Sequence, residues 1–130
     1  MTILDSCVWI AFFNESDSQH AKARKIFEVL SSRILLPEHV VLEVATVLSL
    51  RASKGIADIF IERVIDNSDI EIRVFQHDEF FEVCRDYRRS ASARLSFVDI
   101  ALLGLSAAHT VVTFDRHLKK AIDAPRRRKS

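Results

Sequence analysis

Glycine, proline and cysteine are scarce in this chain of 130 residues. The two glycines, Gly55 and Gly104, stand far apart, so neither of the glycine-rich loops that cradle nucleotide phosphates is present. With only two prolines as well, a collagen-like or low-complexity chain is excluded. The two cysteines, Cys7 and Cys84, form no CxxC pair and have apolar neighbours. Neither a structural zinc site nor a disulfide framework is therefore expected.

Long apolar runs are missing as well. A membrane-spanning helix needs about 18 or more consecutive apolar residues, and no such stretch occurs. The N-terminal segment has no basic start and reaches an acid at Asp5, which is not typical of a signal peptide. We therefore expect a soluble cytoplasmic protein with no membrane segment.

Composition and charge indicate one globular domain followed by a short tail. Hydrophobic residues make up 48% of the chain, which is sufficient for a core at this length. The formal net charge is +1, but four of the 19 basic residues lie at 126–129. Residues 1–125 thus hold 15 basic and 18 acidic residues, a net charge of −3. We predict a domain over 1–124 and a basic, disordered tail over 125–130, which could contact nucleic-acid phosphates or simply be solvated.

The apolar pattern alternates between short strands and longer helices. Buried strands are predicted at 2–5 and 34–36, an alternating strand at 70–75 and a fourth strand at 111–114. Helical spacing of apolar residues predicts helices from Asp17 or Ser18 to about 30, and over 38–53, 57–67, 77–89 and 96–108, with Gly55 as the break between the second and third. Strands separated by helices favour an α/β fold with three α/β/α layers around a mostly parallel sheet of four or five strands.

Four acidic residues occupy unusual positions in this pattern. Asp5 ends the first strand and Asp115 ends the last one, so both are expected at the same edge of a parallel sheet. Glu43 and Asp99 lie within apolar helical segments, with no lysine or arginine three or four residues away. A buried carboxylate without a partner costs several kcal/mol. Taken singly, Asp5 and Asp115 could be helix caps, and the other two could pair with a distant base.

Clustered carboxylates repel one another unless a cation compensates their charge. Oxygen ligands of this kind suit Mg²⁺ or Mn²⁺ better than Zn²⁺. Such ions activate water and stabilise charge on phosphoryl oxygens. The acids therefore point to chemistry on a phosphodiester.

Four segments carry a resemblance to a known family, in the family's order and over nearly the whole chain. They are 3–6 (ILDS) with 9–11 (WIA), 41–44 (VLEV), 95–101 (LSFVDIA) and 112–116 (VTFDR). The sequence resembles PIN-domain nucleases, in particular the VapC-type toxins of bacterial toxin–antitoxin pairs. This resemblance implies a metal-dependent ribonuclease that uses Mg²⁺ or Mn²⁺. It implies Asp5, Glu43, Asp99 and Asp115 as catalytic and metal-binding residues, and Ser6 and Thr113 as supporting residues.

The same resemblance implies three partners: RNA as substrate, an antitoxin protein as inhibitor, and a second copy of the chain. Two apolar segments, 9–13 and 38–50, hold more hydrophobic surface than a monomer of this size needs to bury, which also favours a symmetric dimer. RNA contacts are predicted on the basic side chains flanking the third segment, with an ordinary solvated face as the alternative; these are Arg85, Arg88, Arg89, Arg94 and Arg116. The five histidines show no metal-binding spacing and are interpreted as surface residues.

Three other functions are alternatives to the toxin. A phosphoacceptor receiver domain needs a pair of acids after the first strand and a lysine after a later one, and both are missing. A housekeeping PIN-domain RNA-processing nuclease would use the same four acids. A catalytically silent PIN-like binding module would not need them. These last two remain the alternatives.

Overall fold

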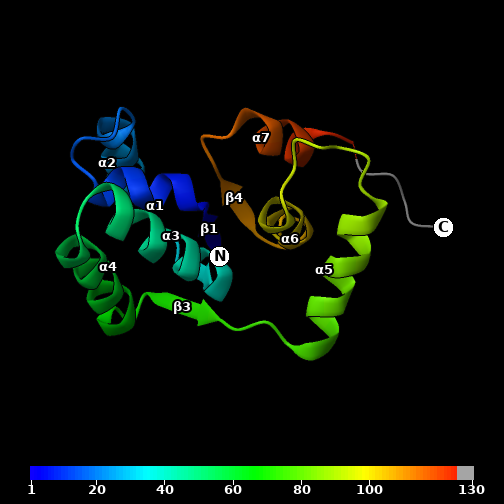
Figure 1. The fold of residues 1–130 in the computed structure, drawn as a ribbon, viewed down its shortest axis with the longest axis horizontal. Coiled ribbons are helices and arrows are strands. Elements are labelled where there is room, and N and C mark those ends of the chain that lie inside the picture. The colour runs from blue at the N-terminus through cyan, green and yellow to red at the C-terminus, as the bar shows by residue number, and fades with distance from the viewer. Residues whose placement is uncertain (126–130) are drawn as a thin grey trace.

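The computed structural model describes residues 1–125, which form four strands and seven helices (Figure 1). The strands are β1 (Thr2–Leu4), β2 (Ile34–Pro37), β3 (Ile70–Arg73) and β4 (Thr110–Val112). The helices are α1 (Ser6–Phe13), α2 (His20–Val29), α3 (Glu38–Arg51), α4 (Lys54–Asp66), α5 (His77–Arg89), α6 (Phe97–Leu105) and α7 (Arg116–Asp123). Of the tail predicted at 125–130, all but Pro125 lies outside the described residues.

The four strands form one sheet in the order β3-β2-β1-β4, and each neighbouring pair is parallel. Thr2 of β1 lies opposite Ile34 of β2 on one side and Thr110 of β4 on the other. Because every strand runs in the same direction, all four carboxyl ends meet at one edge. The parallel sheet predicted from the sequence is confirmed, with four strands in the described part of the chain.

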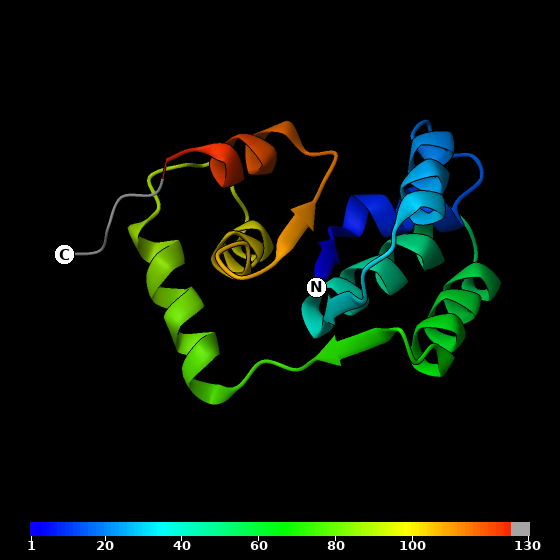
Figure 2. The same cartoon turned by 180° about the vertical axis from the view of Figure 1, so that it is seen from behind.

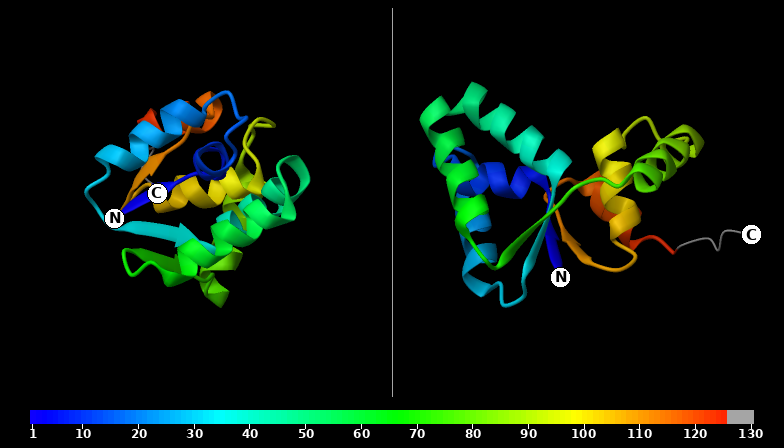
Figure 3. Two further views of the ribbon diagram at one scale, coloured as in Figure 1. Left: turned by 90° about the vertical axis from the view of Figure 1, so that its left-hand side faces the viewer. Right: turned by 90° about the horizontal axis from the view of Figure 1, so that it is seen from below.

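Helices cover both faces of the sheet, as the view from below shows most clearly (Figure 3, right). Helices α1 to α4 lie on one face and α5 to α7 on the other, which is the arrangement also seen from behind (Figure 2). The reversal from β3 to β4 carries the chain back across the sheet, so a right-handed crossover places α5 and α6 on the opposite face. The three-layer α/β/α architecture is confirmed.

The main core lies between the sheet and α1 to α4. Trp9 of α1 is nearly fully buried and makes edge contacts with Phe27 of α2 at 5.2 Å and Phe60 of α4 at 5.7 Å between ring centroids. A smaller cluster around Val83 and Ile100 joins α5 to α6 on the other face. Aromatic packing of this kind is among the larger single contributions to a core.

This core changes one expectation about the segment at 9–13. The structure buries Trp9, Ile10 and Ala11 within the monomer, so the interpretation of this segment as surplus apolar surface is wrong. On α3, by contrast, Leu42 and Leu50 are 68% and 80% exposed. Only the second of the two segments therefore offers free apolar surface to a partner.

Three helix boundaries differ from the sequence prediction. The chain turns into α1 directly after Asp5, and no helix was predicted there. The break between α3 and α4 falls at Ser53, whose hydroxyl accepts the Ile56 N–H, whereas Gly55 lies inside the first turn of α4. Helix α2 begins at His20, because the Asp17 carboxylate accepts the Gln19 N–H in a turn instead of capping the helix.

None of the helices within residues 1–125 combines the length and the apolar character that crossing a membrane requires.

Candidate active site

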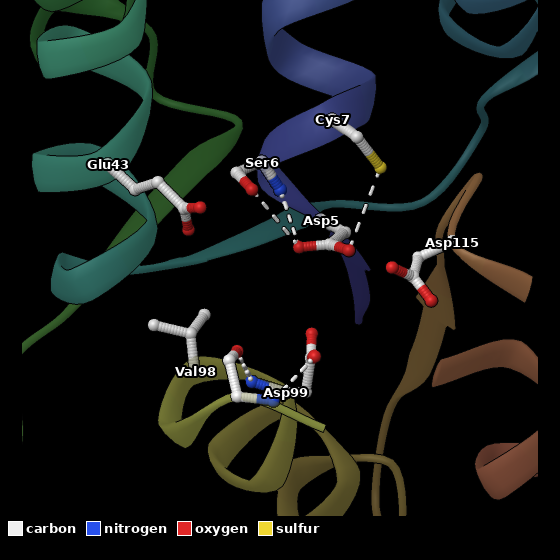
Figure 4. A pocket seen from close by; sticks show the side chains of 8 residues that line it. Asp5, Ser6, Cys7, Glu43, Val98, Asp99 and Asp115 are labelled. Atoms are coloured by element: carbon white, nitrogen blue, oxygen red, sulfur yellow. Dashed lines mark hydrogen bonds between the residues drawn. The ribbon is translucent and has the colours of Figure 1, made fainter. Parts of the chain in front are cut away.

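A pocket of about 260 Å³ lies at the carboxyl edge of the sheet, where both helical layers meet it (Figure 4). All four acids singled out in the sequence line this pocket. Its full lining is Asp5, Ser6, Cys7, Glu43, Ser96, Val98, Asp99 and Asp115. Residues up to 110 positions apart in the chain are thus brought together by the strand order, with β1 next to β4.

Asp5 is the most buried of the four acids, with 5% of its surface exposed. It caps α1, and its Oδ1 accepts the Ser6 N–H at 2.7 Å. Its Oδ2 accepts the Thr113 hydroxyl at 2.7 Å, across from the neighbouring strand. Asp5 is therefore both a helix cap and a member of the acidic cluster, and its burial is balanced by hydrogen bonds.

Asp115 is held in the same way at the start of α7. Its Oδ1 accepts the backbone N–H groups of His117 at 2.8 Å and Leu118 at 3.0 Å. The Asp115 N–H in turn donates to Thr113 Oγ1 at 3.0 Å. One threonine hydroxyl consequently connects two acids, because it donates to Asp5 and accepts from Asp115. This placement agrees with the supporting position predicted for Thr113.

Asp99 lies in the first turn of α6 and not deep in an apolar helix, as the sequence suggested. It forms a capping box with Ser96: Oδ2 accepts the Ser96 N–H at 2.9 Å, while Ser96 Oγ accepts the Asp99 N–H at 3.1 Å. This local partner was missed, although the Ser-x-x-Asp spacing signals it. The side chain extends from α6 toward Asp5 and Asp115 (Figure 4).

Glu43 was expected on an apolar face, and the structure places it beside that face. Val40 and Val44, four residues apart, point into the core. Glu43 precedes Val44 by one residue, which rotates it about 100° around the helix axis. It is exposed and approaches the pocket from α3, on the side opposite Asp115 (Figure 4).

The pocket concentrates negative charge. Although Glu43 is exposed overall, the partial burial of its carboxyl group in the pocket raises its pKa, and the charges of Asp5 and Asp99 raise it further, while a hydrogen bond from Ser6 works against them. Burial also raises the pKa of Asp99, and Asp5 and Asp115 add to this effect against the bonds from Ser96. The ion pairs found within residues 1–125, Lys54–Asp58 and Arg73–Glu79, involve none of the four acids. Among residues 1–125, no basic side chain therefore forms an ion pair with these acids.

These donors fit the chemistry of a hard divalent cation. The caps occupy one oxygen each of Asp99 and Asp115, and the second oxygen is not engaged by them. In the described part of the chain, no three Asp, Glu, His or Cys side chains are already close enough to hold one ion together. Mg²⁺ usually keeps several waters and needs only one or two direct carboxylates, so wider spacing agrees with its chemistry.

Cys7 is a pocket residue that sequence reasoning missed. Its sulfur lies 3.6 Å from both Asp5 Oδ2 and Thr113 Oγ1, and it accepts the Phe114 N–H at 3.3 Å. Burial raises the pKa of the thiol, and the charge of Asp5 raises it further. The signal was its position two residues after Asp5, which faces the site only if α1 starts there.

The predicted RNA-binding arginines do not line the pocket. Arg85, Arg88 and Arg89 are exposed on α5, the outer helix of the second layer, and Arg116 is exposed at the start of α7. Arg94 lies in the segment before α6, and its Nη1 is 3.5 Å from Nε2 of His117.

Two histidines depart from their interpretation as surface residues: His109, whose Nδ1 is buried without a hydrogen-bond partner among the described residues, and His39. Both ring nitrogens of His39 are buried and have no hydrogen-bond partner among the described residues. The ring stacks on Phe75 at 4.9 Å between centroids, and burial lowers its pKa. His39 lies in the first turn of α3 and does not line the pocket.

Comparison with known protein families shows which family this chain belongs to. The family model described as the PIN domain matches residues 2–123. The chain belongs to the PIN-domain family. The predicted PIN resemblance is thereby confirmed, and the matched range includes all four acids of this PIN domain.

The fold also matches a solved structure closely. VapC20 of Mycobacterium tuberculosis, described as a toxin that cleaves the sarcin–ricin loop, superposes with a TM-score of 0.83 at 18% sequence identity. The match covers 93% of this chain and 95% of VapC20. At this identity the similarity is one of fold. A comparison with curated protein sequences gives no significant match.

Proposed function

We propose that this PIN domain is a metal-dependent endoribonuclease and the toxin of a bacterial toxin–antitoxin pair. The observation that supports this most is the meeting of Asp5, Glu43, Asp99 and Asp115 in one pocket that contains no basic side chain. Such a pocket suits a cation and, through it, a phosphodiester. The toxin assignment rests on the fold shared with VapC20.

The four acids are proposed to hold the cation together, with one or two carboxylates as direct ligands and the others reaching it through its waters. Asp5 is the fixed point of the site, because backbone and hydroxyl donors hold both of its oxygens. Asp99 and Asp115 each use one oxygen in a helix cap, which orients the other oxygen. When bound, Mg²⁺ or Mn²⁺ would offset the negative charge on the phosphate oxygens and lower the pKa of the attacking water.

Glu43 is proposed to orient that water and to accept its proton. It reaches the pocket from the other helical layer and is not tied to a helix cap, so its carboxylate can adjust. Its raised pKa favours proton uptake. The water oxygen forms the new bond to phosphorus, the bond to the 3′ oxygen breaks, and that oxygen takes a proton from solvent. The products are then a 5′-phosphate and a 3′-hydroxyl.

An RNA-cleavage assay tests this proposal. Single-stranded RNA is incubated with the protein in Mg²⁺, in Mn²⁺ and in EDTA, and the ends of the products are identified. Cleavage only with metal, leaving 5′-phosphate ends, supports the proposal. A 2′,3′-cyclic phosphate would show that the 2′-hydroxyl of the RNA attacks instead. Absence of cleavage with every metal would favour the silent binding module.

The partners follow from the same proposal. An RNA substrate places the protein in the cytoplasm, and an antitoxin from a neighbouring reading frame should protect cells that overexpress this chain. If it does not, a housekeeping RNA-processing nuclease with the same acids becomes the better assignment. Exposed Leu42 and Leu50 on α3 support a homodimer. Light scattering that gives a mass near 14.9 kDa would reject it.

A further inference from the structure

Two basic side chains meet at the rim of the acidic pocket. Arg94 precedes α6 and His117 lies in the first turn of α7, and their Nη1 and Nε2 atoms are 3.5 Å apart although 23 residues separate them. Each lies two residues from a pocket-lining residue, Ser96 in one case and Asp115 in the other. In Figure 1 the segment before α6 passes beside α7, which brings the two together.

This pair lacks the partner that such groups usually have. A guanidinium carries five N–H donors and normally meets a carboxylate or a phosphate. Neither Arg94 nor His117 takes part in an ion pair within residues 1–125. Asp115 precedes His117 by two residues, but no ion pair joins its carboxylate to either side chain within residues 1–125. The His117 ring thus takes up at most one of the five guanidinium donors, and the others point to an anionic ligand.

The positive charge of this rim comes from Arg94. Helices α6 and α7 begin nearby, at Phe97 and Arg116, but the carboxylates of Asp99 and Asp115 already cap these N-termini. The guanidinium is therefore a positive group beside a pocket that is negative. This contrast fits a polyanion with two neighbouring phosphates. One phosphate enters the pocket together with a cation, and the next phosphate stays outside, at the rim.

We propose that Arg94 and His117 together bind one phosphate of the RNA strand, next to the linkage that is cleaved. The inference rests on the proposed ribonuclease function and adds the position of the substrate to it. Arg94 supplies charge and several donors, and the imidazole N–H of His117 supplies another. Arg85, Arg88 and Arg89, on the outer helix α5, are not part of this site.

Binding can be tested without cleavage. The Kd of a fluorescent single-stranded RNA is measured in EDTA for the wild type, Arg94→Ala, His117→Gln and the double variant. Arg51→Ala, an exposed arginine at the end of α3, and His77→Gln on α5 are the matched controls. We expect Arg94→Ala and His117→Gln each to bind RNA about tenfold more weakly than the wild type. The double variant should lose much less than a hundredfold in affinity, because both side chains contact the same phosphate. The slope of log Kd against the logarithm of the salt concentration should be smaller by about 0.7 in Arg94→Ala than in the wild type, and should stay unchanged in His117→Gln.

RNA with one neutral methylphosphonate linkage, moved along the strand, locates the phosphate. The wild type should lose affinity at one linkage where Arg94→Ala loses none. Equal losses at all linkages in both proteins, or an unchanged salt dependence in Arg94→Ala, would overturn the inference. So would an effect of the rim variants on antitoxin binding alone.

The outcome separates the inference from the proposed function. If the rim variants lose RNA binding but the wild type does not cleave in Mg²⁺ or Mn²⁺, the phosphate site stands and the nuclease fails. If the wild type cleaves and the rim variants bind RNA as it does, the nuclease stands and the phosphate site fails.

Discussion

Thr113 is the side chain whose removal should disturb the site most selectively. Its hydroxyl donates to Asp5 Oδ2 at 2.7 Å and accepts the Asp115 N–H at 3.0 Å. Thr113→Val keeps the shape of the side chain and removes both hydrogen bonds. The buried carboxylate of Asp5 then retains only the weak Cys7 thiol contact on that oxygen.

The structure sets the size of the effect. A hydrogen bond to a charged group contributes about 1.5–3 kcal/mol, and a buried acceptor that loses its donor also bears its desolvation cost. The Asp115 N–H is near solvent, so water replaces much of its lost bond. We therefore expect Thr113→Val to lower the free energy of unfolding by about 2–3 kcal/mol. With a urea slope of about 1–3 kcal/mol/M for a small domain, the midpoint should fall by about 1–3 M.

Urea unfolding in EDTA at pH 7 measures this change, with Thr46→Val as the matched control. Thr46 is exposed on α3, where its hydroxyl donates to the Leu42 carbonyl, so its loss should cost less than about 0.5 kcal/mol. Thr113→Ser should restore most of the stability, because it returns the hydroxyl. RNA cleavage should fall at least tenfold in Thr113→Val and recover in Thr113→Ser.

Equal small losses in Thr113→Val and Thr46→Val would refute this reasoning. The hydroxyl would then not hold Asp5, and other groups would have to carry the cost of burying its carboxylate.

Three further predictions concern single side chains. Asp99→Asn should abolish cleavage but keep the fold, because the amide oxygen still accepts the Ser96 N–H. Burial and neighbouring acids raise the pKa of Asp99 above its unfolded value of 3.8. The variant should therefore gain stability over the wild type as the pH rises from about 4 to 7 in EDTA. Trp9→Ala should cost about 3–5 kcal/mol in urea unfolding, because it empties a fully packed aromatic site. Iodoacetamide at pH 7.5 should alkylate Cys7 more slowly than Cys84, as peptide mass mapping can show, because burial and a neighbouring carboxylate raise the Cys7 pKa.

Each of these has a result that contradicts it. Loss of folding in Asp99→Asn would make the acid structural, and a stability difference that does not change with pH would contradict its raised pKa. A Trp9→Ala loss below about 1 kcal/mol would show that the site collapses around the gap. Faster labelling at Cys7 than at Cys84 would mean that the pocket activates the thiol.

Helix α1 shows where sequence periodicity fails. Segment 6–13 is apolar on all sides of the helix, because α2, α3 and the sheet surround it. A helix without a polar face has no 3.6-residue pattern to detect. The strongly amphipathic helix α5 was predicted at its observed bounds, since it has one face in water.

The sequence by itself determined the alternation of strands and helices, the parallel sheet and the placement of Asp5 and Asp115 at strand ends. These features depend on local burial patterns that any short window of the chain records. It also singled out Glu43 and Asp99, which line the pocket, although the reason was partly wrong: neither is buried in an apolar face, and Asp99 is half of a capping box. Their catalytic and metal-binding roles stay predictions.

Only the tertiary structure decided how the pieces of the site are joined. Thr113 bridges Asp5 and Asp115 because β4 pairs with β1, and no local sequence pattern predicts this strand order. The contact between Arg94 and His117 likewise requires α6 and α7 to pack on the same face. Hydrogen bonds between distant residues depend on which elements become neighbours, and that choice is made by packing the whole core at once.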